Sequence, residues 1–293
     1  MGAVFLQKFS LYSGRPKLPP DSARLCNTQN YMPGCFLSVR QVIALAFLFA
    51  VSNARVGAQG DGVSPGPSPT AETLHYDVEW RLITAGKAEL HIEPERDSNR
   101  NGWEAKVHLE SAGLVSRLYK LDDHYSVALE KQFCAVSSSL DAFEGKKHHD
   151  TKVTYDSQKG HATYVERDVF KNTTVSKETP IPSCVSDVIG GLYKLRTMHV
   201  EPGQSITIPT SDGKKTAQVR IEAQEREQIS TGLGSFKTIR YEAFLFNGVI
   251  YARKASMLVW LTDDARRLPV RIRARMSFPI GSITLDLEKI EHS

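Results

Sequence analysis

Apolar and polar side chains alternate with a period of two along most of the chain after residue 72. Segment 74–82 shows the pattern: every second residue is apolar, and His, Asp, Glu and Arg stand between. Such alternation predicts β-strands that bury one face and expose the other. The same signal recurs at 88–92, 105–109, 125–129, 151–155, 161–165, 205–209, 217–221, 236–243, 257–261, 270–276 and 283–287.

One segment, at about 184–199, breaks this period. Its apolar residues recur at intervals of three and four, which predicts a helix with one buried face. We expect Ser183 or Ser186 to cap its start and Pro202-Gly203 to end it. Glycines lower helix propensity, so Gly190–Gly191 indicates a close packing contact.

Many strands and one principal helix predict a mainly β fold. We expect a large curved antiparallel sheet or half-open barrel, packed against the helix at about 184–199. A shorter helical turn is expected around 114–119. The sequence contains no internal repeat, and we predict a single β-rich domain over 72–293.

The N-terminal region predicts export. The ten apolar residues at 42–51 follow a basic residue and precede small residues up to Ala58. This order is typical of a secretory signal peptide at 32–58, cleaved after Ala58 or, as the alternative, Ala54. The run is shorter than the roughly 20 residues of a transmembrane helix. The competing interpretation is a buried core helix.

Two further segments flank this leader. Residues 1–31 precede a normal signal start and are interpreted as a mis-called upstream extension. Residues 59–71 are rich in Gly, Pro and Ser, which predicts a flexible linker. Together these segments predict a periplasmic protein whose mature chain has no transmembrane span.

The net positive charge of the chain comes from its N-terminal leader, residues 1–58. The formal charge is +4, with 37 Lys and Arg against 33 Asp and Glu. Residues 1–58 hold six of these bases and one acid, which leaves 31 bases and 32 acids in the rest. A body this close to neutral argues against a nucleic-acid partner.

Two cysteines, Cys134 and Cys184, remain after the leader. In an exported protein an even number suggests a disulfide. The alternative is a pair of buried free thiols. Their spacing matches no zinc-binding and no C-x-x-C redox pattern, so they indicate no cofactor.

Acidic and histidine clusters offer candidate chemistry at 122–124, 148–150 and 263–264. No EF-hand, H-E-x-x-H, P-loop or G-x-S-x-G pattern accompanies them, so we predict no metal site and no cofactor. Adjacent strand residues point to opposite faces, which separates the two histidines at 148–149. We interpret the carboxylates as turn or helix-start residues that pair with neighbouring cations, Lys120, Arg266 or Arg267.

Arginines alternate with apolar residues over 267–275. The pattern is typical of a strand with one wet cationic face, and the alternative is a surface for an anionic head group. We name four possible ligand contacts: Arg271, Arg273, Tyr119 and Tyr193.

The segment 260–270 is expected to connect two antiparallel strands tightly. Thr262 or Asp263 would accept backbone N–H bonds across the turn. Arg266 or Arg267 would pair with a loop carboxylate, and Pro269 would open the second strand. Inward side chains, including Trp260, Val270 and Ile272, would build the core. On this interpretation the motif is structural and comprises Trp260, Thr262, Asp263, Asp264, Arg267 and Pro269.

The order of short motifs resembles a bacterial family catalogued as domain of unknown function 3108 (DUF3108). The most specific piece is the segment 260–270. The other matching pieces are 76–80, 85–88, 111–115, Tyr119, 122–123, 143–147, 187–188, Gly203, 212–215 and 232–236. The resemblance implies an exported, β-rich protein with no established activity and no catalytic residues to carry over.

Three functions remain open. The first is a non-catalytic periplasmic protein that binds a hydrophobic or lipid-like ligand, or serves in maintenance of the cell envelope. The second is an envelope glycan or lipid hydrolase, and the third is a protein-interaction scaffold with an apolar surface patch. The hydrolase would use carboxylates and imidazoles from Asp263, Asp264, His124 or Glu144.

Overall fold

The computed structural model describes residues 70–95, 101–277 and 281–292. The predicted upstream extension, the signal peptide with its two cleavage sites, and nearly all of the linker lie outside these residues.

Fourteen strands form one antiparallel sheet, which confirms the mainly β prediction. The strands lie in the order β8-β7-β6-β5-β4-β3-β2-β1-β14-β13-β12-β11-β10-β9. Their bounds are β1 Glu72–Trp80, β2 Ile83–Pro94, β3 Gly102–Ser111, β4 Leu121–Glu130, β5 Ala135–Glu144, β6 Lys147–Asp156, β7 His161–Asp168, β8 Thr173–Pro180, β9 Ser205–Ser211, β10 Thr216–Thr231, β11 Gly234–Ala243, β12 Ala255–Thr262, β13 Pro269–Met276 and β14 Ser282–His292. Two helices, α2 (Gly113–Leu118) and α3 (Val188–Arg196), interrupt them.

Two strands, β5 and β8, lack the alternation that predicts a strand. The edge strand β8 is exposed at every residue but Thr179, so it has no buried face to mark it in the sequence. In β5, three consecutive serines at 137–139 hide the period. Both strands are specified by pairing with their neighbours rather than by their own pattern.

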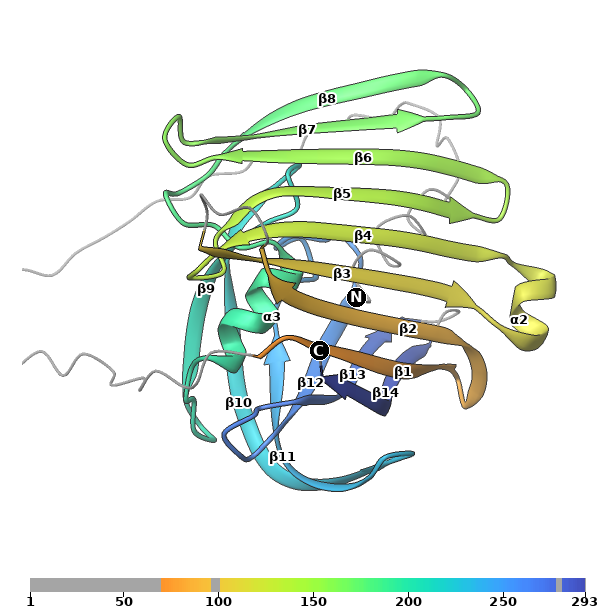
Figure 1. The fold of residues 1–293 in the computed structure, drawn as a ribbon, viewed down its shortest axis with the longest axis vertical. Coiled ribbons are helices and arrows are strands. Elements are labelled where there is room, and N and C mark those ends of the chain that lie inside the picture. The colour runs from red at the N-terminus through yellow and green to blue at the C-terminus, as the bar shows by residue number, and fades with distance from the viewer. Residues whose placement is uncertain (1–69, 96–100, 278–280, 293) are drawn as a thin grey trace, which may run out of the picture. The chain divides into compact units, whose positions relative to one another are not determined.

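The sheet curls around α3 (Figure 1), so β1–β8 pass on one side of the helix and β9–β13 on the other. The turn between β9 and β10 reaches back to β6 and β7. There a Cβ at Gly213, whose φ is +83°, would lie 2.7 Å from Val153 and 3.1 Å from Tyr164. We call the face toward α3 the inner face and the opposite face the outer face.

Helix α3 is shorter than the predicted 184–199, and its cap differs from the predicted serines. Asp187 is the N-cap, and its carboxylate accepts hydrogen bonds from the N–H groups of Ile189 (3.0 Å) and Gly190 (2.8 Å). Ser186 instead donates to the carbonyl of Phe133. The helix ends at Thr197, before the predicted Pro202-Gly203. The preceding residues extend along β9, which delays the helix start.

The disulfide joins Cys134 to Cys184, with Cα atoms 5.0 Å apart. It links the connection between β4 and β5 to the segment that leads into α3. Hydrogen bonds flank this link. The Ser186 hydroxyl donates to the carbonyl of Phe133. The Ala135 N–H donates to the carbonyl of Val185. The helix therefore begins from a fixed point on the inner face.

The two glycines of α3 have opposite surroundings. A Cβ at Gly190 would lie 2.8 Å from Leu129 Cδ2 and 3.0 Å from the carbonyl oxygen of Phe133. This is the close contact that the sequence predicts. A Cβ at Gly191 would meet nothing within 4 Å.

Alanine substitutions should therefore act in opposite directions. Gly191→Ala should raise the free energy of unfolding by about 0.5–1 kcal/mol, because alanine is the better helix former. Gly190→Ala should lower it by about 1–3 kcal/mol, because the new methyl group has no space. Urea unfolding of both variants checks this, and equal shifts for the two would contradict the packing described.

Candidate functional site

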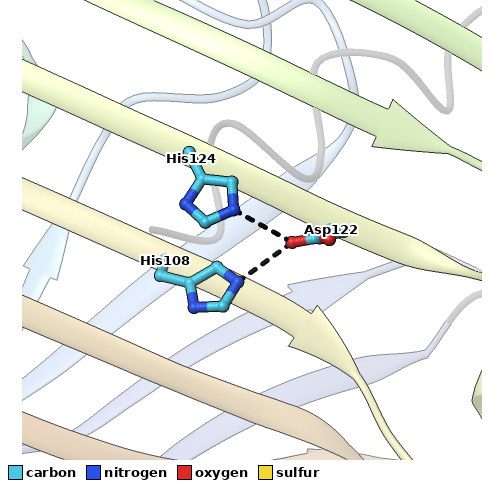
Figure 2. Close-up of side chains that lie close together, drawn as sticks. All are labelled: His108, Asp122 and His124. Atoms are coloured by element: carbon cyan, nitrogen blue, oxygen red, sulfur yellow. Dashed lines mark hydrogen bonds and ion pairs between the residues drawn. The ribbon is translucent and has the colours of Figure 1, made fainter.

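Two histidines and an aspartate meet on the outer face of β3 and β4 (Figure 2). His108 and His124 are cross-strand partners, and their rings stack with centroids 4.1 Å apart and planes within 8°. Both Nε2 atoms approach the same oxygen, Oδ1 of Asp122, at 3.0 Å and 3.2 Å. The three side chains offer ligand atoms within 4.8 Å of one another, which is compact enough to hold a metal ion.

The surroundings keep the carboxylate of this cluster ionised. The hydrogen bond with His108 holds the pKa of Asp122 below its ordinary value. The cross-strand neighbours are also acidic: Glu89 faces His108 and Glu110 faces Asp122. The acidic character therefore extends beyond the three residues.

A second group, Asp141, His148 and Asp150, lies on the same face over β5 and β6. The Nε2 atom of His148 is 2.7 Å from Asp141 and 3.8 Å from Asp150. Its ring stacks on Phe143 at 3.8 Å. Asp141 is also the cross-strand partner of His124, so the two groups adjoin.

These positions correct the sequence interpretation of residues 122–124. They belong to β4 and not to a turn, and the partners of Asp122 are His108 and His124 rather than the predicted cations. The sequence does not indicate that His108 belongs to this cluster, because it lies 14 residues before Asp122. Only the pairing of β3 with β4 brings the two together.

An apolar cavity of about 60 Å³ lies on the inner side, between α3 and β9–β13. Thr210 is the one lining residue with a polar side chain among those that the structure describes. The lining residues are Val188, Ile189, Gly191, Leu192, Leu195, Ile208, Thr210, Val219, Ile221, Ala243, Leu245, Met257, Val259 and Ile272.

A second cavity of about 60 Å³ is a neighbour of the first, and Val188 and Ile189 line both. This second cavity has hydroxyl and carboxyl groups in its wall. Asp187 accepts a hydrogen bond from the Tyr125 hydroxyl at 2.8 Å there. Its other polar lining residues are Ser138, Ser139, Thr151, Tyr155, Tyr164, Ser211, Asp212 and Tyr251.

None of the four predicted ligand contacts is among the described lining residues of either cavity. Arg271 forms an ion pair with Asp286 across β13 and β14. Arg273 stacks over the ring of Trp260, 5.4 Å from its centroid. These arginines are engaged with neighbouring strands on the outer face.

The two tyrosines of that prediction also have other surroundings. Tyr193 is fully buried, and Arg196 lies over its ring. Burial, followed by the carboxylates of Glu144 and Asp123, raises the pKa of Tyr119 to about 12. Different tyrosines line the polar cavity: Tyr125, Tyr155, Tyr164 and Tyr251.

The connection between β12 and β13 is held by Thr262 and Asp264. The Thr262 hydroxyl accepts the N–H of Leu268 at 2.8 Å and lies 2.6 Å from Oδ1 of Asp264. The same carboxyl oxygen accepts the N–H groups of Arg266 and Arg267 at 3.0 and 3.1 Å. Pro269 is the first residue of β13.

Other members of this motif have different roles. Asp263 pairs with Arg226 at 2.8 Å instead of capping the turn. Arg267 is buried and donates to the Tyr241 hydroxyl at 2.8 Å.

Trp260 is buried in the hydrophobic core together with Val270 and Ile272, but it does not lie on the same face of the sheet as Ile272. Trp260 is the cross-strand partner of Arg271, whereas Ile272 pairs with Val259, so Trp260 lies on the outer face. Its indole N–H donates to Glu227 of β10 at 2.7 Å. It is nevertheless buried, because Arg273 and Glu227 cover it.

The residues proposed for a hydrolase do not converge. His124 pairs with Asp141 on the outer face, whereas Glu144 pairs with Leu121, three positions away, and therefore lies on the inner face. Asp263 and Asp264 lie in the turn after β12, with their own partners. His124 and Glu144 therefore lie on opposite faces of the sheet, and the carboxylates of Asp263 and Asp264 are engaged with their own partners at the turn.

Comparison with known proteins gives a family and structural neighbours. The family model "Protein of unknown function (DUF3108)" matches residues 75–288. A β-barrel-like DUF1849 protein of Brucella abortus has 8% identity and a TM-score of 0.49, covering 78% of this chain and 99% of that chain. A Bacteroides fragilis protein described as exported, with a YmcC-like fold, has 10% identity, a TM-score of 0.29 and the same coverages. Among curated proteins none matches significantly.

No helix among the described residues is long and apolar enough to cross a membrane.

Substitutions in the β12–β13 turn should separate its two aspartates. Asp264→Ala should lower the free energy of unfolding by about 1–2 kcal/mol, because two backbone N–H groups and a hydroxyl lose their acceptor. Asp263→Ala should change it by less than about 1 kcal/mol, because it removes only a part-exposed ion pair. Urea unfolding of the two variants is the measurement, and a larger loss from Asp263→Ala would contradict the assignment.

The buried N-cap should give a pH-dependent signature. Burial raises the pKa of Asp187 despite hydrogen bonds from Gly190, Tyr125 and Ile189 that favour its charged form. A carboxyl group whose pKa is higher in the folded than in the unfolded state stabilises the fold at low pH. This contribution to the free energy of unfolding is lost as the pH rises and the carboxyl group ionises. Asn can still cap the helix.

The stability of the wild type relative to Asp187→Asn should therefore fall as pH rises from about 4 through the raised pKa. Unfolding free energies of both proteins measured across this range test the sign. A relative gain for the wild type with rising pH would show that its carboxylate is stabilised in the folded state.

Proposed function

The chain belongs to the DUF3108 family, and we propose that it is an exported periplasmic protein that holds a lipid-like ligand of the cell envelope between α3 and the inner face of the sheet. The apolar cavity beside α3 carries this proposal. Its wall is formed by one face of the helix and by five strands. Among the described lining residues, Thr210 alone has a polar side chain. Ligand sites are typically apolar pockets with few polar groups, but they enclose about 300–1,000 Å³, so this cavity must widen to hold a ligand.

The adjoining polar cavity gives the proposed ligand a direction. Val188 and Ile189 line both cavities, so their displacement would join the two spaces. An amphiphile would then place its chain against β9–β13 and its polar end near Tyr125 and Asp187. The hydroxyl and carboxyl groups there supply hydrogen bonds. This arrangement favours a single-chain amphiphile over a ligand that is apolar throughout.

Binding requires movement of α3. A volume of about 60 Å³ holds about two water molecules, so an acyl chain enters only when the helix face withdraws from the strands. Val188 and Leu192, which form that face, are only partly buried. Gly191 adds no side chain between them.

Export is supported by two features. The leader has the order of a secretory signal peptide. The disulfide between Cys134 and Cys184 suits an oxidising compartment.

An exposed apolar patch favours the scaffold as a second candidate. Leu82 and Ile83, at the β1–β2 turn, are 92% and 49% exposed, and Leu114 and Leu118 of α2 are 66% and 78% exposed. Helix α2 packs beside β2, so the four residues lie toward one end of the sheet.

If this function is correct, Leu114→Ser with Leu118→Ser abolishes capture of an envelope partner and leaves ligand binding intact.

Filling the cavity tests the proposed function. Gly191→Leu places a side chain in the space beside α3, and Gly191→Ala is the matched control that adds one methyl group. We expect native mass spectrometry of wild type and Gly191→Ala, purified from the periplasm, to show an added amphiphile mass. Gly191→Leu should show the apo mass alone.

Thermal unfolding of the apo proteins establishes that the variants are folded. The proposal is overturned if wild type carries only the apo mass and also fails to bind a fluorescent fatty acid. It is equally overturned if folded Gly191→Leu binds that fatty acid as tightly as wild type does.

A further inference from the structure

We propose that the outer face of β3 and β4 carries a site for a divalent transition-metal ion of the zinc class, held by His108, Asp122 and His124. The ligands are the two imidazole Nε2 atoms and the Oδ1 atom of the carboxylate (Figure 2). The site is independent of the ligand proposed above, because it lies on the opposite face of the sheet.

The distances between the ligand atoms fit such an ion. Zinc binds imidazole nitrogen and carboxylate oxygen at about 2.0–2.2 Å, so two ligand atoms at a tetrahedral angle lie about 3.3 Å apart. The Nε2 atoms of His108 and His124 are 3.0 and 3.2 Å from Oδ1 of Asp122. The two imidazole rings are stacked almost parallel, so they must tilt toward each other before both Nε2 lone pairs point at one ion.

The sheet fixes these three positions in advance. Asp122 and His124 are two residues apart on β4, so both point to the outer face. His108 is placed opposite His124 by the pairing of β3 with β4. The three side chains are 37–60% exposed, so an ion can reach them directly from solvent.

Charge and chemistry select the ion. The cluster includes a carboxylate, and the acidic residues Glu89, Glu110 and Asp141 are cross-strand neighbours of its members. Two lysines, Lys106 and Lys152, also line the hollow beside the cluster. A set of two imidazoles and one carboxylate suits Zn²⁺ or Cu²⁺, whereas Mg²⁺ and Ca²⁺ prefer oxygen ligands.

Three protein ligands leave a coordination position open. Beside the cluster the outer face has a hollow of about 580 Å³, whose wall includes His108, His124 and Asp141. A water molecule or a small anionic ligand can occupy the fourth position from that side.

Isothermal titration with Zn²⁺ alone tests the site, on the whole exported protein purified without a polyhistidine tag. We expect one tight equivalent of Zn²⁺ per chain and no comparable binding of Mg²⁺. His108→Ala, His124→Ala and Asp122→Asn should each weaken that equivalent by about tenfold or more. Zn²⁺ should also raise the melting temperature of wild type but not that of His108→Ala.

Two control variants make the result specific. His161→Ala removes a histidine of β7 outside the cluster and should leave the affinity unchanged. Asp141→Asn changes the neighbouring group. If Asp141→Asn loses Zn²⁺ binding while His108→Ala keeps it, the ion is bound by Asp141, His148 and Asp150. That outcome, absence of a saturable equivalent, or equal affinity in wild type and His108→Ala overturns the proposal.

Discussion

The whole fold depends on burial of the inner face of one curled sheet, and helix α3 is the element that fills it. The helix is short, so its position is set by its ends. At the start, the Asp187 carboxylate caps the helix and accepts the Tyr125 hydroxyl of β4. At the end, buried Arg196 pairs with buried Glu72 of β1. Since burying an ion pair costs solvation energy, we assign this pair to orientation of the helix more than to net stability.

The β12–β13 turn completes this anchoring, because its backbone carbonyls bind both the end of α3 and strand β1. Arg196 donates to the carbonyl of Arg266, at 3.2 Å, and the Tyr76 hydroxyl donates to the carbonyl of Pro269, at 2.9 Å. Thr262 and Asp264 hold the turn in the shape that presents these carbonyls. The end of α3, strand β1 and the turn therefore form one connected unit.

The sequence predicts those parts of the fold in which burial follows a simple period. Strand β1 shows the period of two, and α3 shows intervals of three and four, so both were found. Strand β12 is buried on both faces from Met257 to Thr262, so its pattern cannot assign a face to Trp260. The cluster around Asp122 depends on strand register, and the sequence gives no local signal that His108 will lie beside it. The helix cap was missed because the extended pairing of Ser186 with β9 moves the helix start to Asp187.

Strand β4 joins the two faces of the molecule. Its even-numbered residues Asp122 and His124 form the outer cluster, and odd-numbered Tyr125 holds the cap of α3 on the inner side. Both depend on one register, because a slip of one residue would send each side chain to the opposite face. Val127 and Leu129, buried on the inner face, oppose such a slip. The hydrophobic core therefore fixes the register of β4, and this register places both the outer cluster and the residue that holds α3. The core acts on the cluster through the backbone of β4, since the described contacts of the two Nε2 atoms are with Asp122.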